Sequence, residues 1–243
     1  MPPLRVLDAP PPTGAGAIPV RPNRDRRGTS RPRRLTRAAR GKNPTTVRPR
    51  MRPSPGPSLL DRIELPIETR RLLLRPPSRS DVPALVPLVG DWRVARPTRI
   101  PHPYSAQQGY DFVRNAAQKR RRGTDLALVI LDKENGRLMG GTGIHRIDWG
   151  NRYFELGYWV APSEWGKGIA AEAAYAVCRE GFRTLRMHRI EAHVYEFNPR
   201  SARVLRKIGF HKEGRLRDGH RDGRRWADVF SFGLLADELR VPP

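Results

Sequence analysis

The sequence predicts a single mixed α/β domain of the α+β kind, over residues 59–240, behind a basic leader of residues 1–58. Three observations support this prediction. From Ile67 onward, short apolar segments of strand length alternate with longer segments of helical pattern. Three of the strand segments follow one another with only turn residues between them. The length of 243 residues suits one hydrophobic core of ordinary size together with a tail.

The domain opens with a strand and two helices. The apolar run Ile67–Arg75 has the composition of a strand. A helix is expected over residues 80–88, because Pro83 falls early enough to be tolerated in the first turn. Ser105 is a favourable N-cap for a longer helix, Ala106–Arg122, which a glycine ends.

An antiparallel meander and a second run of helices and strands complete the expected pattern. The meander consists of Asp125–Leu131, Arg137–Ile147 and Tyr153–Val160. It is followed by a helix Ile169–Thr184, a strand Arg189–Tyr195, a helix Pro199–Lys207 and two strands, Phe210–Arg217 and Trp226–Leu235.

Charge distinguishes the leader from the domain. The chain has 47 Lys and Arg against 24 Asp and Glu, a net charge of +23. Residues 1–58 hold 14 of the basic and only two of the acidic residues, together with many prolines and few large apolar side chains, so we expect them to be disordered. Such an arm suits contact with RNA or the ribosome; the alternative is a solvated extension, with Met51 as the true start.

The cysteine content and the hydropathy of the sequence exclude several classes of protein. Cys178 is the only cysteine, which excludes a domain held together by intrachain disulfides. No apolar run is long enough to cross a bilayer, and the first residues lack the apolar core of a secretory signal. The histidines lack the spacing of a metal site. We therefore expect a cytoplasmic protein with no bound metal and no membrane contact.

The most specific local feature is the segment Tyr158–Ala170, YWVAPSEWGKGIA, in which a strand leads through a short loop into a helix. Gly166 and Gly168 allow the main chain to approach a ligand closely, and the first amides of the helix attract an anion. Lys167 adds a positive charge. The spacings of the Walker loop and of the dinucleotide fingerprint are absent. The segment predicts a phosphate or pyrophosphate site, with an ordinary strand-to-helix turn as the alternative.

A second feature is Asn198–Phe210, NPRSARVLRKIGF, which has a capping residue, a proline at the first helical position and a closing glycine. Each of these has a purely structural explanation. Asn198 and Ser201 nevertheless share a helix N-terminus, which opens beside the glycine loop if the strands that begin at Tyr153 and Arg189 are neighbours. Such convergence of polar groups is typical of a binding cleft.

Together these motifs resemble the GNAT superfamily of acyl-CoA N-acyltransferases, and within it the Rim-type ribosomal-protein alanine N-acetyltransferases and their small-molecule relatives. The resemblance covers Ile67–Glu238. It is carried by TRRLLLR at Thr69–Arg75, GGTGIH at Gly140–His145, ELGYWV at Glu155–Val160, WGKGIAAEA at Trp165–Ala173, the motif from Asn198, and Asp228.

The resemblance implies a mostly antiparallel, twisted sheet that is flanked by helices and splayed at its centre, between the strands that begin at Tyr153 and Arg189. Acetyl-CoA would lie in the gap as co-substrate, with its pyrophosphate on the main-chain amides of the glycine loop and its pantetheine arm along the preceding strand. The implied cofactor-binding residues are Trp159, Val160, Trp165, Gly166, Lys167, Gly168, Ile169, Ala170 and Asn198, where Trp165 departs from the usual Gln or Arg of the family's phosphate motif.

Acetyl transfer to an amine requires a neutral amine and a proton for the departing thiolate. Glu155 is expected to take the ammonium proton through water, helped by a pKa raised by burial, and the alternative is a structural or substrate-positioning role. The resemblance implies that Ser201 is the acid, because it is placed like the hydroxyl that has this role in some Rim-type enzymes; the later helix position at which many relatives have a tyrosine offers none here. The alternative for Ser201 is a plain hydroxyl at a helix N-terminus. His145 and His193 are weaker candidates for the base, with packing as the alternative. Candidates to line the acceptor pocket are Trp92, Trp149 and Trp226, with core or surface packing favoured for each.

The acceptor itself stays open at this stage. The N-terminal amine of a ribosomal protein and a small amine, such as an antibiotic or a polyamine, both fit the resemblance. The net positive charge of the domain favours an acidic acceptor, or simply reflects the anionic co-substrate. A non-catalytic module of the same fold, tethered to RNA by the leader, is the alternative from another class.

Overall fold

The computed structural model of the protein describes residues 58–242. The predicted disorder of the leader therefore lies outside the described residues, except at Ser58. The hydroxyl of Ser58 accepts a hydrogen bond from the amide of Leu60 at 3.2 Å and caps the first 3₁₀ turn, Leu59–Arg62.

Within these residues, eight strands form one sheet in the order β1-β2-β3-β4-β5-β6-β8-β7. The strands are β1 Ile67–Glu68, β2 Leu72–Arg75, β3 Leu126–Asp132, β4 Leu138–Asp148, β5 Tyr153–Val160, β6 Arg189–Tyr195, β7 His211–Asp222 and β8 Arg225–Leu235. The α-helices are α1 Val82–Val89, α2 Trp92–Ala95, α3 Ala106–Arg122, α4 Ile169–Arg183 and α5 Pro199–Lys207. Short 3₁₀ turns also lie at Arg79–Asp81, Pro162–Glu164 and Ala236–Glu238.

Most predicted elements are confirmed to within one or two residues, but the first strand is not. Residues 67–75 form two short antiparallel strands, β1 and β2, with a turn between them. The turn is fixed from outside, because the hydroxyl of Thr69 and the amide of Arg71 both donate to Glu172 Oε1 on α4, at 2.6 and 3.0 Å. No local pattern in the sequence predicts this contact between the turn and α4.

The other differences concern α2, which the sequence did not predict, and the last hairpin. The strand expected to end at Arg217 continues as β7 to Asp222, across an irregularity between Leu216 and His220. Asp218 takes a left-handed conformation there, with φ of 51°. A strand that is mostly polar and mostly exposed has no apolar alternation by which to recognise it.

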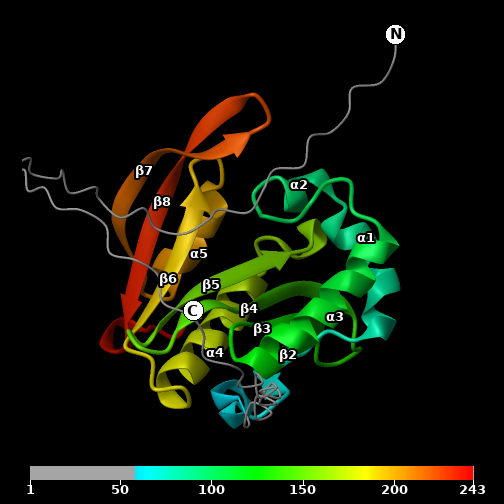
Figure 1. The fold of residues 1–243 in the computed structure, drawn as a ribbon, viewed down its shortest axis with the longest axis horizontal. Helices are drawn as coiled ribbons and strands as arrows, with labels where there is room; N and C mark the ends of the chain where they lie inside the picture. Colours follow the sequence, from blue (N-terminus) through cyan, green and yellow to red (C-terminus); the bar gives the residue numbers. More distant parts are fainter. Residues whose placement is uncertain (1–57, 243) are drawn as a thin grey trace, which may run out of the picture. The chain divides into compact units, whose positions relative to one another are not determined.

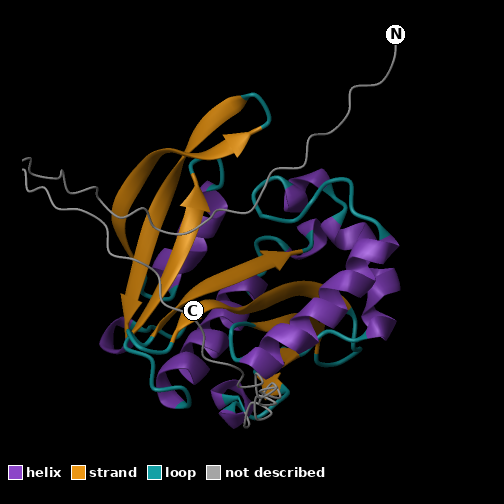
Figure 2. Cartoon of the chain, viewed as in Figure 1, coloured by secondary structure: helices purple, strands orange, loops and turns teal. Residues whose placement is uncertain are grey.

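Helices cover both faces of the sheet (Figure 2). Side chains on β3 divide between the two layers, since successive residues of a strand point to opposite faces. Leu128 and Ile130 belong to the larger core, which includes α4. Val129 and Leu131 belong to a smaller core with α1, against which Phe112 of α3 packs. The candidate site described below lies near the centre of the sheet, where β5 and β6 separate.

The sheet opens between β5 and β6, the only parallel pair among the described strands. Pairing is limited to three positions, which end at Glu155 opposite Glu191. Beyond them β5 continues to Val160 beside β4, while β6 continues beside β8, and the two diverge (Figure 1). The prediction of a sheet splayed at its centre is confirmed.

Candidate active site

The glycine loop joins β5 to α4 beside the opening of the sheet. Gly166 and Gly168 both have φ of 80°, a left-handed conformation that glycine adopts without steric cost. With this conformation at both glycines, the chain passes from the loop directly into the first turn of α4, which begins at Ile169.

The amides of residues 166–171 form a run of free donors. None of them makes a hydrogen bond of ordinary geometry with any part of the chain that the structure describes, and the first amide of α4 to do so is that of Glu172, which donates to the carbonyl of Gly168 at 3.0 Å. The positive end of the helix dipole lies at the same place. A run of unpaired amides at a helix N-terminus fits a pyrophosphate.

A clamp from the β1–β2 turn holds this loop. Arg71 donates from Nε to Glu172 Oε2 at 2.7 Å and from Nη1 to the carbonyl of Lys167 at 2.9 Å. Glu172 therefore ties the turn to α4, and Arg71 carries the connection on to the loop. This explains the TRR motif of the sequence: Thr69 and Arg71 position the loop.

The side chain of Lys167 is engaged in this structure. Its Nζ lies 3.2 Å from Glu164 Oε2, and the other oxygen of Glu164 is 2.9 Å from Nη1 of Arg137. A different cation lies close by, because the guanidinium of Arg200 at the start of α5 sits 4.5 Å from the ring centroid of Trp165. Positive charge at the loop thus comes from both sides of the opening.

Polar groups meet across the opening of the sheet. The hydroxyl of Tyr158 on β5 lies 2.8 Å from that of Ser201 on α5 and donates to the Ser201 carbonyl at 3.1 Å. Asn198 Oδ1 accepts from the Ser201 amide at 3.3 Å, as a helix cap. The expected meeting of the α5 N-terminus with β5 is therefore present, and Tyr158 is a member that sequence reasoning missed.

Burial raises the pKa of Tyr158 far above its usual range, against the opposing effect of the hydrogen bond with Ser201. The Tyr158 hydroxyl is therefore a protonated donor throughout the physiological range. The two other predicted members of this strand lie just beyond it: the ring of Trp159 packs in the smaller core, and the carbonyl of Val160 accepts from Trp165 Nε1 at 2.8 Å.

Glu155 occupies the last paired position of β5 and is only 8% exposed. One of its oxygens is ion-paired with Arg99, and the other lies 3.2 Å from Nη1 of Arg146. Arg146 reaches it from the irregular end of β4, where φ of this residue is 50°. His193 Nδ1 lies 3.7 Å from Glu155 Oε1, and no described residue is within hydrogen-bond distance of that nitrogen.

The predicted raised pKa of Glu155 is wrong. Burial acts to raise this pKa, but neighbouring His193 and the positive charges of Arg99 and Arg146 outweigh burial and lower it from 4.5 to about 2. Burial of Glu155 could be expected from its strand, but its two arginines come close only in the folded chain, Arg146 through the pairing of β4 with β5 and Arg99 from 56 residues away in the sequence. Glu155 is a permanent anion at neutral pH.

Other candidates from the sequence have contacts elsewhere in the chain. His145 Nδ1 is 3.1 Å from Asp125 Oδ1, and Trp149 donates to the carbonyl of Gly123 at 2.9 Å, so each has a structural partner. Trp92 is exposed and packs edge-on against His102. Cys178 is fully buried in the larger core, and burial strongly raises the pKa of its thiol.

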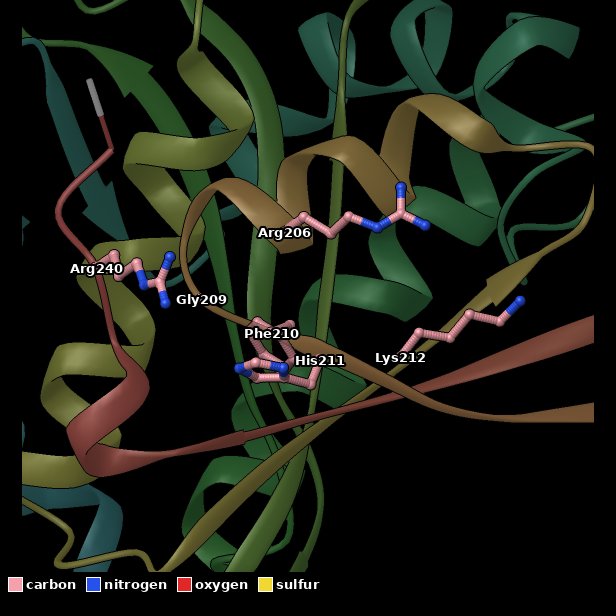
Figure 3. Close-up of a pocket in the computed structure, with 6 residues that line it drawn as sticks. All are labelled: Arg206, Gly209, Phe210, His211, Lys212 and Arg240. Atoms are coloured by element: carbon pink, nitrogen blue, oxygen red, sulfur yellow. The ribbon is translucent and has the colours of Figure 1, made fainter.

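A separate cavity of about 270 Å³ lies at the C-terminal end of α5, lined by Arg206, Gly209, Phe210, His211, Lys212 and Arg240. Its three long basic side chains do not converge, because Arg206 and Lys212 extend away from Arg240 (Figure 3). None of the site residues described above lines it, so we place no chemistry there.

Comparison with known proteins decides the family. The acetyltransferase (GNAT) domain family matches residues 71–211. The chain belongs to this family. The resemblance inferred from the motifs is therefore confirmed, and with it the activity class: this GNAT protein is an N-acetyltransferase that uses acetyl-CoA. The run of unpaired amides at the start of α4 fits the pyrophosphate of that co-substrate.

Individual relatives are similar at moderate identity. The GNAT chain is 33% identical over 170 residues to an uncharacterized N-acetyltransferase, p20, of Bacillus licheniformis, which covers 70% of this chain and 96% of the relative. It is 29% identical over 109 residues to the ribosomal protein uS5-alanine N-acetyltransferase of Escherichia coli, 44% of this chain and 56% of the relative. A solved structure, Mycobacterium smegmatis RimJ in complex with CoA-disulfide, matches with a TM-score of 0.64 and 28% identity, over 70% of this chain and 85% of that one.

Residues 58–242 contain no cluster of three or more metal-ligating side chains, and no helix in that range has the length and hydropathy to cross a bilayer.

The environment of Glu155 predicts a pH dependence of stability. A carboxyl whose pKa falls from 4.5 to about 2 on folding stabilises the native state fully above pH 4.5 and loses that contribution as the pH falls toward 2. Between pH 6 and 3, urea titration should show that the wild type loses on the order of 1 kcal/mol more unfolding free energy than Glu155→Gln. Parallel losses in the two proteins would mean that the arginines do not stabilise the carboxylate.

Proposed function

We propose that this GNAT protein acetylates the N-terminal amine of a protein whose first residues are acidic. The observation that carries the proposal is the charge around Glu155. Its single negative charge is shared between Arg99 and Arg146, so this side of the opening has an excess of positive charge. An acceptor for this site must bring one amine and, next to it, anionic groups.

This charge discriminates between the two acceptor classes that the sequence left open. A polyamine carries several ammonium groups, all but one of which would lie against guanidinium groups. A peptide N-terminus brings one ammonium group, which Glu155 can hold, and acidic side chains that can pair with Arg99 and Arg146. The uS5-alanine acetyltransferase among the relatives supports a ribosomal protein as the acceptor.

The co-substrate is held from the main chain in this proposal. The amides of residues 166–171 receive the pyrophosphate, with Trp165, Lys167 and Arg200 beside it. The edge of β5 that has no strand partner beyond Glu155, near Trp159 and Val160, and Asn198 opposite, receive the pantetheine arm, and the carbonyl of Val160 stays bonded to Trp165 Nε1. Acetyl-CoA supplies a thioester whose carbonyl carbon the neutral amine attacks.

Two proton transfers fall to this chain's own residues. Glu155, with its pKa of about 2, is too weak a base to deprotonate an ammonium directly, so we assign it to anchoring the amine. His193 Nδ1 lies 3.7 Å from it and is assigned to accepting the proton through a water molecule. Tyr158 and Ser201, joined by their hydroxyls, donate a proton to the departing thiolate.

The pyrophosphate placement predicts that Gly168→Glu abolishes acetyl-CoA binding. The change adds bulk and negative charge beside the free amides and strains a residue with φ of 80°. Gly136→Glu is the matched control, because Gly136 also has a left-handed φ, of 70°, and a Cβ added there would have no atom within 4 Å. Calorimetric titration should give wild-type affinity for the control and no heat for Gly168→Glu; equal affinity in both would remove the loop from the site.

The proton-donor assignment predicts non-additive effects. Tyr158→Phe and Ser201→Ala should each lower kcat about 100-fold with little change in KM for acetyl-CoA, because each interrupts the same pair of hydroxyls. The double variant should be little slower than either single variant. Steady-state rates of thiol release measure this, and a wild-type kcat for both single variants would sink the assignment.

The acceptor assignment predicts a substrate order. A pentapeptide that begins Ser-Asp-Asp should have a kcat/KM at least tenfold above that of one that begins Ser-Lys-Lys, and spermidine should be the poorest acceptor. Arg99→Gln should reduce the preference for the acidic peptide about tenfold, while Arg114→Gln, an exposed arginine on α3, should leave it unchanged. A preference for spermidine in the wild type would overturn the proposal.

A further inference from the structure

The β7–β8 hairpin extends beyond the rest of the sheet. β6 ends its pairing with β8 at Tyr195 opposite Val229. β7 and β8 continue as a two-stranded ribbon to the pair Asp222 and Arg225, and the ribbon projects from the body of the domain (Figure 1). An isolated two-stranded ribbon is marginally stable unless something holds one of its faces.

One face of the ribbon is held by the domain. The ring of His220 stacks on that of Tyr195, with 3.8 Å between the centroids. On the same face, Asp222 Oδ2 lies 2.9 Å from Nη2 of Arg96, the residue that follows α2. These contacts fix the position of the ribbon.

The opposite face is open and carries an aromatic ring between arginines. Trp226 pairs with Arg221 across the ribbon, so the two side chains share this face, and Trp226 is 60% exposed. Because it points away from the side that contacts Arg96, Trp226 does not belong to the acceptor pocket for which the sequence made it a candidate. The arginines of the tip, 221, 224 and 225, are exposed, and none forms an ion pair with a residue in 58–242.

Charge determines which partner this face suits. Residues 211–226 hold six basic and three acidic side chains. Two of the acids are used elsewhere, since Glu213 pairs with Arg189 and Asp222 with Arg96. A second copy of the same face would meet like charge, which disfavours self-association. The partner must be anionic and must present flat rings to Trp226.

A single nucleic-acid strand has both properties. Its phosphates pair with arginine, and its unpaired bases stack on an exposed indole whatever their sequence. Lys212 lies on the same face of the ribbon as Trp226, since it is paired with Phe232. Lys212 pairs with Phe232 and Arg221 pairs with Trp226, which are six residues apart on β8. At ~3.3 Å per residue, the span is about 20 Å, enough for a few nucleotides.

We propose that the open face of the β7–β8 hairpin, built around Trp226, Arg221 and Arg224, binds single-stranded nucleic acid, with one base stacked on Trp226. The surface lies on the opposite side of the ribbon from the amine-binding groups. It therefore adds a binding function to the enzyme and requires no change in the acetyl-transfer site.

The first test is anisotropy of a fluorescently labelled 12-nucleotide uridine strand titrated with the full chain. Trp226→Ala should weaken binding about tenfold at every salt concentration, because stacking does not release counterions. Trp92→Ala, which removes another exposed indole, is the matched control and should bind as the wild type does. Equal affinities for wild type and Trp226→Ala would overturn the proposal and assign any binding to the rest of the chain.

The second test separates charge from stacking. Arg221→Gln combined with Arg224→Gln should lower the slope of log affinity against log salt by roughly 1.4, about 0.7 for each lost phosphate contact. Arg121→Gln combined with Arg122→Gln on α3 removes the same charge elsewhere and should leave the slope unchanged. A 12-nucleotide deoxyuridine strand in place of uridine shows whether the 2′-hydroxyl contributes. Loss of binding to phosphatidylserine vesicles, but not to either strand, in Trp226→Ala would make the surface a membrane contact and refute the proposal.

Discussion

The three-position pairing of β5 with β6 is the constraint on which the site depends. Where pairing stops, at Glu155, both strands already have partners on their other sides, so they separate without losing the sheet. The separation leaves one edge of β5 unpaired and lets the N-terminus of α5 approach Tyr158. It also leaves Glu155 at the point where the two strands begin to separate. The carboxylate is buried there and needs charged partners, which Arg99 and Arg146 provide. A fourth or fifth pair would close the opening and remove the co-substrate gap.

A second requirement is that the loop at the opening be held without using its own amides. Hydrogen bonds within the loop would satisfy the donors that an anion needs. Here the loop is held instead through the carbonyl of Lys167 and through Glu172, both by Arg71. The carbonyl of Lys167 is thus used to hold the loop, while the main-chain N–H groups stay free for an anion. The two polar groups of the peptide unit therefore have different roles.

Local patterns made the glycine loop, the α5 cap and the helix boundaries predictable, because the residues that decide them are within four positions of each other. Arg99 and Arg146 could not be found in this way, since they meet Glu155 only after the sheet has formed. The same holds for Glu172, which divides the predicted first strand in two. Tyr158 could have been found: it lies three residues from Glu155 in a motif already recognised, and a buried hydroxyl requires a partner. At Arg99 and Arg146 the fold, and not the local sequence, determines the charge around Glu155.

The burial of Cys178 has a practical consequence for the study of this enzyme. It is the only cysteine of the chain, it is fully buried in the larger core, and burial raises the pKa of its thiol. A disulfide reagent reacts with thiolates that it can reach. With the folded protein, the colour that such a reagent develops in solution therefore reports free coenzyme A alone, turnover by turnover. A delayed second phase equal to one thiol per chain would mark unfolding, so a single cuvette records catalysis and loss of structure on separate time scales.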